Sequence, residues 1–282
     1  MHLRSATFAA HTAHAVSASA DDAVNAINTS AGAGVTVASV ECRSVTFRSV
    51  TCSSHGHNND GIDPESCTDV LIERCTVDTG DDCIAIKAGR NADGRRLAKP
   101  SEHIVIRHCH MADGHAGVAI GSEMTGGVRH VYVHDCTMDS PNLMRALVLK
   151  TNAYRGGQMQ DIHLARIRAG AIDKAFVQIW LQYEEGDGGS FVPSVERVTI
   201  SDASARSADR LLVVRGRPDS PILGLALHNV SIAEERKPSV VLDAKDVVLD
   251  NVTVGGKRWT RDDLDKLPGL SSISCDKWAV CR

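Results

Sequence analysis

The chain has 282 residues, with 31 Lys and Arg, 35 Asp and Glu, and 43% apolar residues, which excludes a disordered, collagen-like or low-complexity protein. A formal net charge of −4 argues against binding a polyanion by bulk electrostatics, so we expect no nucleic-acid partner. No apolar run reaches the 18 residues that a transmembrane helix needs, so we expect no membrane partner either.

Residues 1–34 are predicted to be an N-terminal segment that caps the main fold. Within it, Asp21 and Asp22 precede AVNAIN, a pattern typical of a short helix that the following GAG ends. Arg4 and a weakly apolar run ending in Ala-Ser-Ala at 18–20 resemble an export signal, although histidines and a threonine interrupt the apolar part. The segment therefore does not clearly indicate export.

A short segment of alternating apolar and polar residues, often followed by Cys or Asn and a polar corner, recurs along the chain. Its eight copies occupy residues 42–52, 67–77, 101–111, 128–138, 159–169, 195–205, 222–232 and 244–254. Their starts lie 22 to 36 residues apart, which is the length of one solenoid coil with two or three short strands. The alternation has the period of a strand and not that of a helix.

Equivalent strands of successive coils pair in parallel and in register, which suits columns of Val, Ile, Cys and Asn. We therefore predict an all-β fold, a right-handed single-stranded parallel β-helix over residues 35–259. A leucine-rich repeat fails on the variable coil length, and a propeller is the less favoured alternative. Residues 260–282 are predicted to be a C-terminal cap and tail, in which Thr260 begins a helix that Pro268 and Gly269 end.

The nine cysteines are an odd number, so they cannot all be paired within one chain. Seven of them, up to Cys136, fall at repeat-like positions, which indicates small buried thiols that stack between coils. Cys275 and Cys281 lie close together in the polar tail and are predicted to form a local disulfide.

Aspartates gather at predicted corners between residues 55 and 96. Asp81 and Asp82 are adjacent, so they serve one cleft only if Gly80 places them on a turn. Asp60 lies 21 residues before Asp81, close to one coil, which sets the two corners one rung apart. Close carboxylates raise the pKa of at least one of them, and an acid beside a base is what glycosidic hydrolysis requires. The alternative is that Asp and Asn beside Gly are simply turn residues.

His115 follows about one coil after the aspartate pair, where an imidazole can hydrogen-bond a carboxylate and tune its protonation. Lys150 and Arg155 follow about one coil later and are suited to binding a sugar carboxylate. The alternatives are a surface or core histidine and two solvated cations on a loop.

Together these segments resemble glycoside hydrolase family 28, the polygalacturonases, over residues 40–259, most of all its bacterial and plant-type exo-acting branch. The motifs that carry the resemblance are Asn-Asn-Asp-Gly at 58–61, Gly-Asp-Asp at 80–82, Gly-His-Ala at 114–116 and the lysine of Val-Leu-Lys at 148–150. The resemblance implies that Asp81 is the general acid, that Asp60 and Asp82 activate water, and that His115 supports the ionisation of the adjacent pair Asp81 and Asp82. It also implies inversion, for which carboxyl groups usually stand roughly 6.5–9.5 Å apart.

The resemblance further implies that Lys150 binds a galacturonate carboxylate. Other residues of matching segments are assigned to substrate contact: Asn58, Lys87, Arg90, Arg95, Asn152 and Arg155. The implied partner is polygalacturonate or an oligogalacturonide. We expect no cofactor, no metal ion and a monomer that acts outside the cytoplasm, secreted or periplasmic.

The sequence departs from the family's pattern at four places. Asn59 stands where Thr is usual, Ala116 replaces a Gly, and Val148 replaces the Arg of Arg-Ile-Lys and cannot hold a carboxylate. Fewer coils precede the Asp60 motif than the family generally has, so we expect a chain shortened at its start. The leading hypothesis is an exo-acting hydrolase of α-1,4-galacturonan. The alternatives are a rhamnogalacturonan hydrolase, a Ca²⁺-dependent polysaccharide lyase, or a non-catalytic pectin-binding β-helix.

Overall fold

A computed structural model describes residues 15–17, 27–29 and 35–267 of the chain. The helix predicted at Asp21, the export-like segment before residue 21 and the disulfide between Cys275 and Cys281 lie almost wholly outside these residues. No helix within the described ranges is long and apolar enough to cross a bilayer.

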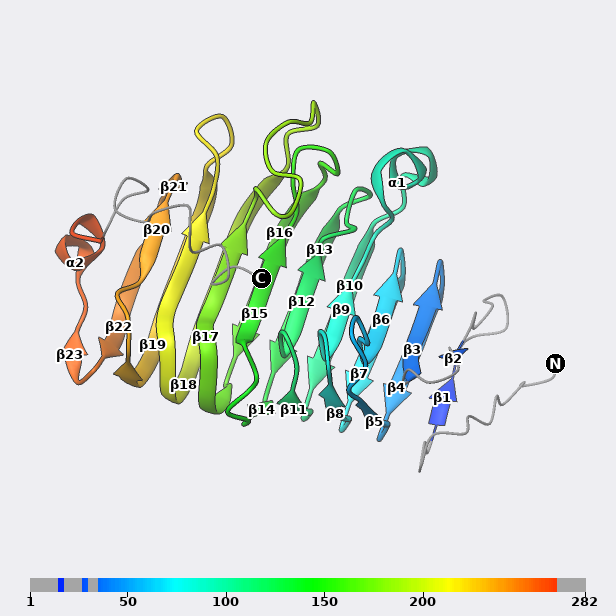
Figure 1. The fold of residues 1–282 in the computed structure, drawn as a ribbon, viewed down its shortest axis with the longest axis horizontal. Helices are drawn as coiled ribbons and strands as arrows, with labels where there is room; N and C mark the ends of the chain where they lie inside the picture. The colour runs from blue at the N-terminus through cyan, green and yellow to red at the C-terminus, as the bar shows by residue number, and fades with distance from the viewer. Residues whose placement is uncertain (1–14, 18–26, 30–34, 268–282) are drawn as a thin grey trace.

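The strands form one hydrogen-bonded sheet that coils along the long axis of the molecule (Figure 1). Three columns of parallel strands follow one another around each coil. The first column holds β4 (Arg43–Arg48), β7 (Thr68–Glu73), β10 (Ser101–Arg107), β13 (Val128–His134), β16 (Gln158–Ala165), the start of β18 (Ser194–Arg215), β19 (Ile222–Glu235) and β22 (Val248–Val254). These strands coincide with the eight sequence copies, and the predicted parallel β-helix is confirmed.

The second column continues each copy: β5 (Thr51–Ser54), β8 (Thr76–Thr79), β11 (His110–Asp113), β14 (Thr137–Met138) and β17 (Arg168–Trp180). The third column holds β3 (Val35–Val40), β6 (Ile62–Glu65), β9 (Ile84–Ile86), β12 (Val118–Gly121), β15 (Arg145–Lys150), the later parts of β17 and β18, and β20 (Val240–Leu242). Four short strands complete the sheet: β1 (Ala15–Ser17), β2 (Ile27–Thr29), β21 (Ala244–Lys245) and β23 (Lys257–Arg258).

Like residues stack in the core because the coils are in register. Ile84, Val118, Leu147 and Val177 are successive partners in the third column, and all four are fully buried. The seven cysteines up to residue 136 are buried thiols, as predicted. The Cys75 N–H donates to the Cys109 sulfur and the Cys109 N–H to the Cys136 sulfur, each at 3.4 Å, so each of these sulfurs accepts from the cysteine one coil earlier.

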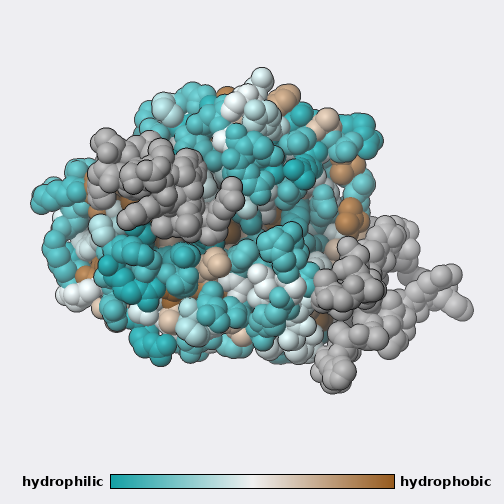
Figure 2. All heavy atoms as spheres, viewed as in Figure 1, coloured by the Kyte–Doolittle hydropathy of each residue, from teal (hydrophilic) through white to brown (hydrophobic). Residues whose placement is uncertain are grey.

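Two helices flank the coils (Figure 1). The helix predicted after Thr260 is present as α2 (Arg261–Asp265), and a capping box joins Thr260 to Asp263. The second, α1 (Asn91–Leu97), is an insertion between β9 and β10 that the sequence pattern did not predict. Around these elements the visible surface is mostly hydrophilic, with apolar atoms in small separate groups (Figure 2).

Candidate active site

The predicted catalytic aspartates lie on corners between the second and third strand columns. Adjacent corners are joined by backbone hydrogen bonds, from Asp81 N–H to the Asn59 carbonyl (3.1 Å) and from Gly61 N–H to the Asp82 carbonyl (3.0 Å). Gly80 is required for this close approach, because a Cβ there would lie 2.5 Å from the Gly56 carbonyl oxygen. The turn predicted for Gly80 therefore stacks the three carboxylates on neighbouring rungs.

One carboxylate oxygen from each of Asp60, Asp81 and Asp82 lies within 4.8 Å of the other two. This spacing is shorter than the roughly 6.5–9.5 Å expected for a pair of carboxyl groups in an inverting enzyme. The carboxylates sit at different depths, with side-chain exposures of 13%, 17% and 3% respectively. The innermost one, Asp82, keeps one buried oxygen without a hydrogen-bond partner among the described residues.

Two lysines neutralise this acidic stack. Lys150 Nζ lies 2.7 Å from Asp82 Oδ2, and Lys87 Nζ lies 2.7 Å from Asp60 Oδ2 and 2.8 Å from Asp63 Oδ2. Burial raises the pKa of Asp82 above its ordinary value against the opposing charge of Lys150. Burial and the charge of Asp60 likewise raise the pKa of Asp63 well above its ordinary value. Lys87 thus binds two carboxylates inside the protein, and its assignment to substrate contact stays a prediction.

His115 contacts the outermost aspartate, with Nδ1 2.8 Å from Asp81 Oδ1. This hydrogen bond raises the pKa of His115 above its ordinary value, even though burial opposes it. Burial acts to raise the pKa of Asp81, but the His115 hydrogen bond and the charge of Lys150 outweigh it, so the net shift is downward. Gly114 fits beneath the pair with a φ of +142°, where a Cβ would lie 2.3 Å from the Asp81 carbonyl oxygen.

A cleft of about 810 Å³ opens above the third strand column. Five of the predicted residues line it: Asn58, Asp81, Asp82, His115 and Lys150. Asp60 lies behind this wall, where one of its oxygens accepts a hydrogen bond from Asp82 N–H (3.1 Å). Seven lining residues were not predicted from the sequence: His57, Arg145, Gln178, Trp180, Tyr183, Glu184 and Glu185. The place of Trp180 beside the cleft could have been predicted from the sequence, because Trp180 follows Lys150 by one coil and is its strand partner.

The family model for glycosyl hydrolases family 28 matches residues 10–245. The chain belongs to glycosyl hydrolases family 28. In this family 28 protein, the resemblance seen in the motifs at 58–61, 80–82 and 114–116 is therefore confirmed at the level of the family, while the roles of individual residues stay predictions.

Named relatives agree with the family. A probable polygalacturonase from Vitis vinifera is 31% identical over 183 residues, covering 62% of this chain and 36% of that protein. An endo-polygalacturonase from Pectobacterium carotovorum subsp. carotovorum is 29% identical over 182 residues, covering 64% and 42%. The crystal structure of a hyperthermoactive exopolygalacturonase from Thermotoga maritima matches with a TM-score of 0.74 at 36% identity, covering 79% and 50%. The chain thus spans half or less of the length of each of these relatives.

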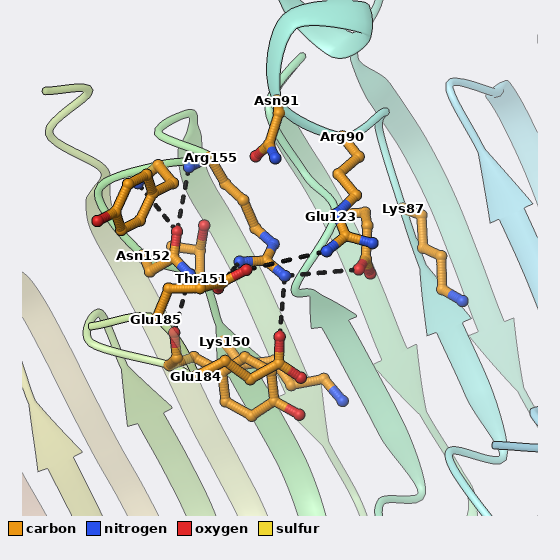
Figure 3. Close-up of polar contacts among 12 residues, drawn as sticks. Lys87, Arg90, Asn91, Glu123, Lys150, Thr151, Asn152, Arg155, Glu184 and Glu185 are labelled. Atoms are coloured by element: carbon orange, nitrogen blue, oxygen red, sulfur yellow. Dashed lines mark hydrogen bonds and ion pairs between the residues drawn. The ribbon is translucent and has the colours of Figure 1, made fainter. Parts of the chain in front are cut away.

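Two residues assigned to substrate contact are instead buried under the cleft rim of this family 28 chain (Figure 3). The Arg155 side chain is 0% exposed, and its guanidinium contacts Glu185 (2.5 Å), Glu184 (3.0 Å) and Glu123 (3.8 Å). Asn152 is also fully buried. These residues hold the loop that carries Glu184 and Glu185 and do not line the cleft, and their assignment to substrate contact stays a prediction.

The two arginines of the α1 region differ from each other. Arg90 is 58% exposed and lies 3.8 Å from Glu185 at the cleft rim, so it is positioned to reach a ligand (Figure 3). Arg95 stacks 3.6 Å over the Phe191 ring, and it donates to the carbonyls of Tyr154 and Arg155 at 3.2 and 3.3 Å. Arg95 thus packs α1 against the rim loops and does not line the cleft, and its assignment to substrate contact stays a prediction.

The described residues contain two groups that could supply metal ligands. One is the trio predicted to be catalytic, Asp60, Asp81 and Asp82, in which Asp60 and Asp82 are already paired with lysines. The other is His55, Asp78 and Asp113 on the second strand column. Because ammonium groups occupy the first group, the arrangement is suited to acid-base chemistry by the carboxylates themselves.

Replacing Asn152 by Ala is expected to lower the free energy of unfolding by about 2–3 kcal/mol. The amide donates to the Tyr183 carbonyl (2.8 Å) and to Glu185 (2.5 Å), and it accepts from the N–H groups of Tyr154 (3.0 Å) and Arg155 (3.1 Å). Urea denaturation measures the change. The control is Asn142→Ala on an exposed loop, expected to cost less than about 0.5 kcal/mol. Equal losses in the two variants would contradict this structural role.

Proposed function

We propose that the chain hydrolyses α-1,4-galacturonosidic bonds of polygalacturonan, with inversion at the anomeric carbon and from a chain end. The observation that carries the proposal is the stack of Asp60, Asp81 and Asp82 beside a cleft that Asp81 and Asp82 line, with Lys150 and His115 in contact with the stack. Family membership and the names of the relatives support the substrate and the reaction. Chain-end action is supported by the similarity to the Thermotoga maritima exopolygalacturonase.

In this proposal Asp81 is the general acid. A general acid needs a proton at neutral pH, although the pKa of Asp81 alone is lowered. The proton is held by the hydrogen-bonded pair, because the pKa of His115 is raised and its Nδ1 lies 2.8 Å from Asp81. A galacturonate carboxylate entering the cleft adds a like charge, which raises the pKa of Asp81 and moves the shared proton toward it. The pair then donates to the leaving glycosidic oxygen.

Asp60 and Asp82 activate the attacking water. Two carboxylate oxygens within 4.8 Å of each other can both accept from one water, since each O–H···O distance is about 2.7 Å. The short distance between the Asp60 and Asp82 oxygens thus fits a water molecule bound between two bases. It differs from the usual inverting arrangement, in which a single base lies on the opposite side of the sugar from the acid. Lys150 holds Asp82 and presents its ammonium to the substrate carboxylate.

The test is hydrolysis of polygalacturonic acid, followed by reducing-sugar release, by product sizing and by the first anomer seen in proton NMR. The proposal predicts monomer or dimer as the early product, with the anomeric configuration inverted. Asp81→Asn is the inactive control. Retention of configuration would overturn the mechanism, and a ladder of mid-sized products would overturn chain-end action. Binding without release by folded protein would favour a pectin-binding role.

A further inference from the structure

We infer that this cleft takes a pectic chain in which the sugar lying over Val148 is uncharged and carries a methyl group at its C6 end. A methyl-esterified galacturonate and a 6-deoxy sugar such as rhamnose share this chemistry. The inference rests on the proposed function, because it specifies the substrate of the same site. One feature of the cleft carries it, namely the composition of its floor beside Lys150.

The floor of the cleft includes Val148 and Gln178, which belong to one column of the third strand layer. Ala85, Ala119, Val148 and Gln178 are successive partners in this column, one from each coil. The first three form a small apolar cluster with Ala116 and are no more than 3% exposed. Val148 itself lines the cleft. A methyl group is matched by this apolar surface, whereas a carboxylate over it would lose hydration without gaining a donor.

Val148 and Lys150 stand on the same strand, two residues apart, so their side chains point to the same face about 6.6 Å from each other. Lys150 is a donor for one carboxylate. Val148 offers none at the adjacent position, where Arg would have placed a second. The floor therefore provides for one charged group next to one apolar group, and not for two carboxylates side by side.

Arg145 does not replace the cation missing at position 148. Its Nε donates to Gln178 Oε1 (2.6 Å) and one terminal nitrogen donates to the His115 carbonyl (3.3 Å). The side chain is buried at 5% exposure and holds the floor beneath the His115 loop. A sideways bidentate contact through Nε is therefore closed to a substrate carboxylate.

The experiment compares three oligosaccharides of equal length: unesterified oligogalacturonate, its partly methyl-esterified form, and an alternating rhamnose–galacturonate oligomer. Initial rates give kcat/KM for the wild type, and calorimetry on Asp81→Asn gives Kd without turnover. We expect at least one methyl-bearing oligomer to exceed the unesterified one about tenfold in both quantities. The oligomer that is preferred shows whether the site takes the methyl ester or the deoxy sugar.

The matched variants are Val148→Arg and Val148→Leu. Arginine is expected to reverse the preference toward the unesterified oligomer by about tenfold, while leucine leaves it unchanged. Wild-type preference for the unesterified oligomer in both rate and Kd overturns the inference and leaves the proposed function standing. A Kd preference for a methyl-bearing oligomer without hydrolysis of any substrate supports the inference on specificity and overturns the proposed reaction. Absence of binding to all three overturns both. The wild-type comparison decides even if Val148→Arg does not fold.

Discussion

Substitution of Asp81 by Asn is expected to lower kcat on the preferred pectic substrate by about 10²–10⁴-fold, which is the usual contribution of a general acid or base. The amide cannot donate the proton that the leaving oxygen needs. Because its size is nearly that of the carboxyl group, the variant should still bind substrate, with a KM within a few-fold of the wild type. Steady-state kinetics on purified protein measures both quantities.

The matched control is Asp78→Asn, the same chemical change three residues earlier on β8. Asp78 contacts His55 and does not line the cleft, so its variant should keep wild-type turnover. NMR titration of His115 adds a second readout. The pKa of His115 is raised by its hydrogen bond to the Asp81 carboxylate, so in Asp81→Asn it should fall toward the ordinary value. An Asp81→Asn enzyme with turnover close to the wild type would refute the assignment.

The first two strand columns could be predicted from the sequence because their residues alternate between core and solvent. The burial of β4, for example, runs from exposed Arg43 through buried Val45 and Phe47 to exposed Arg48. The third column was harder to predict from the sequence, since its strands are covered on both faces. In β15 the residues from Arg145 to Leu149 are all buried, some in the core and some under the cleft, so the alternation is lost.

The catalytic corners were predictable because Asp beside Gly, repeated at the spacing of a coil, brings like charges together in any solenoid. The ion-pair partners of the nearby basic residues could not be predicted from the sequence. Lys87, Arg155 and Lys150 look alike in sequence as basic residues near corners. Which of them faces the cleft depends on contacts such as Lys87 with Asp63 and Arg155 with Glu184, and the second of these joins residues 29 positions apart. Buried ion pairs between coils leave no local pattern.

Replacing Lys150 by Met is expected to lower the free energy of unfolding at neutral pH by about 3–5 kcal/mol, as for other broken buried ion pairs. Asp82 is 3% exposed and would keep its charge in a buried site without the ammonium 2.7 Å away. Burial already raises the pKa of Asp82, and loss of Lys150 should raise it further. The same variant should lose activity, because the donor for the substrate carboxylate is gone.

The pH dependence separates these two effects. An acid whose folded-state pKa is raised contributes stability that is fully present below its unfolded pKa and is lost as pH rises through the folded pKa. The stability deficit of Lys150→Met should therefore shrink as the pH falls and Asp82 takes up a proton, while activity stays low. Urea midpoints at pH 8 and pH 5 test this. The control, Lys99→Met, breaks an exposed pair with Glu41 (54% and 43% exposed) and should cost about 0–1 kcal/mol. A Lys150→Met deficit that grew in acid would show that Asp82 is not the group responsible.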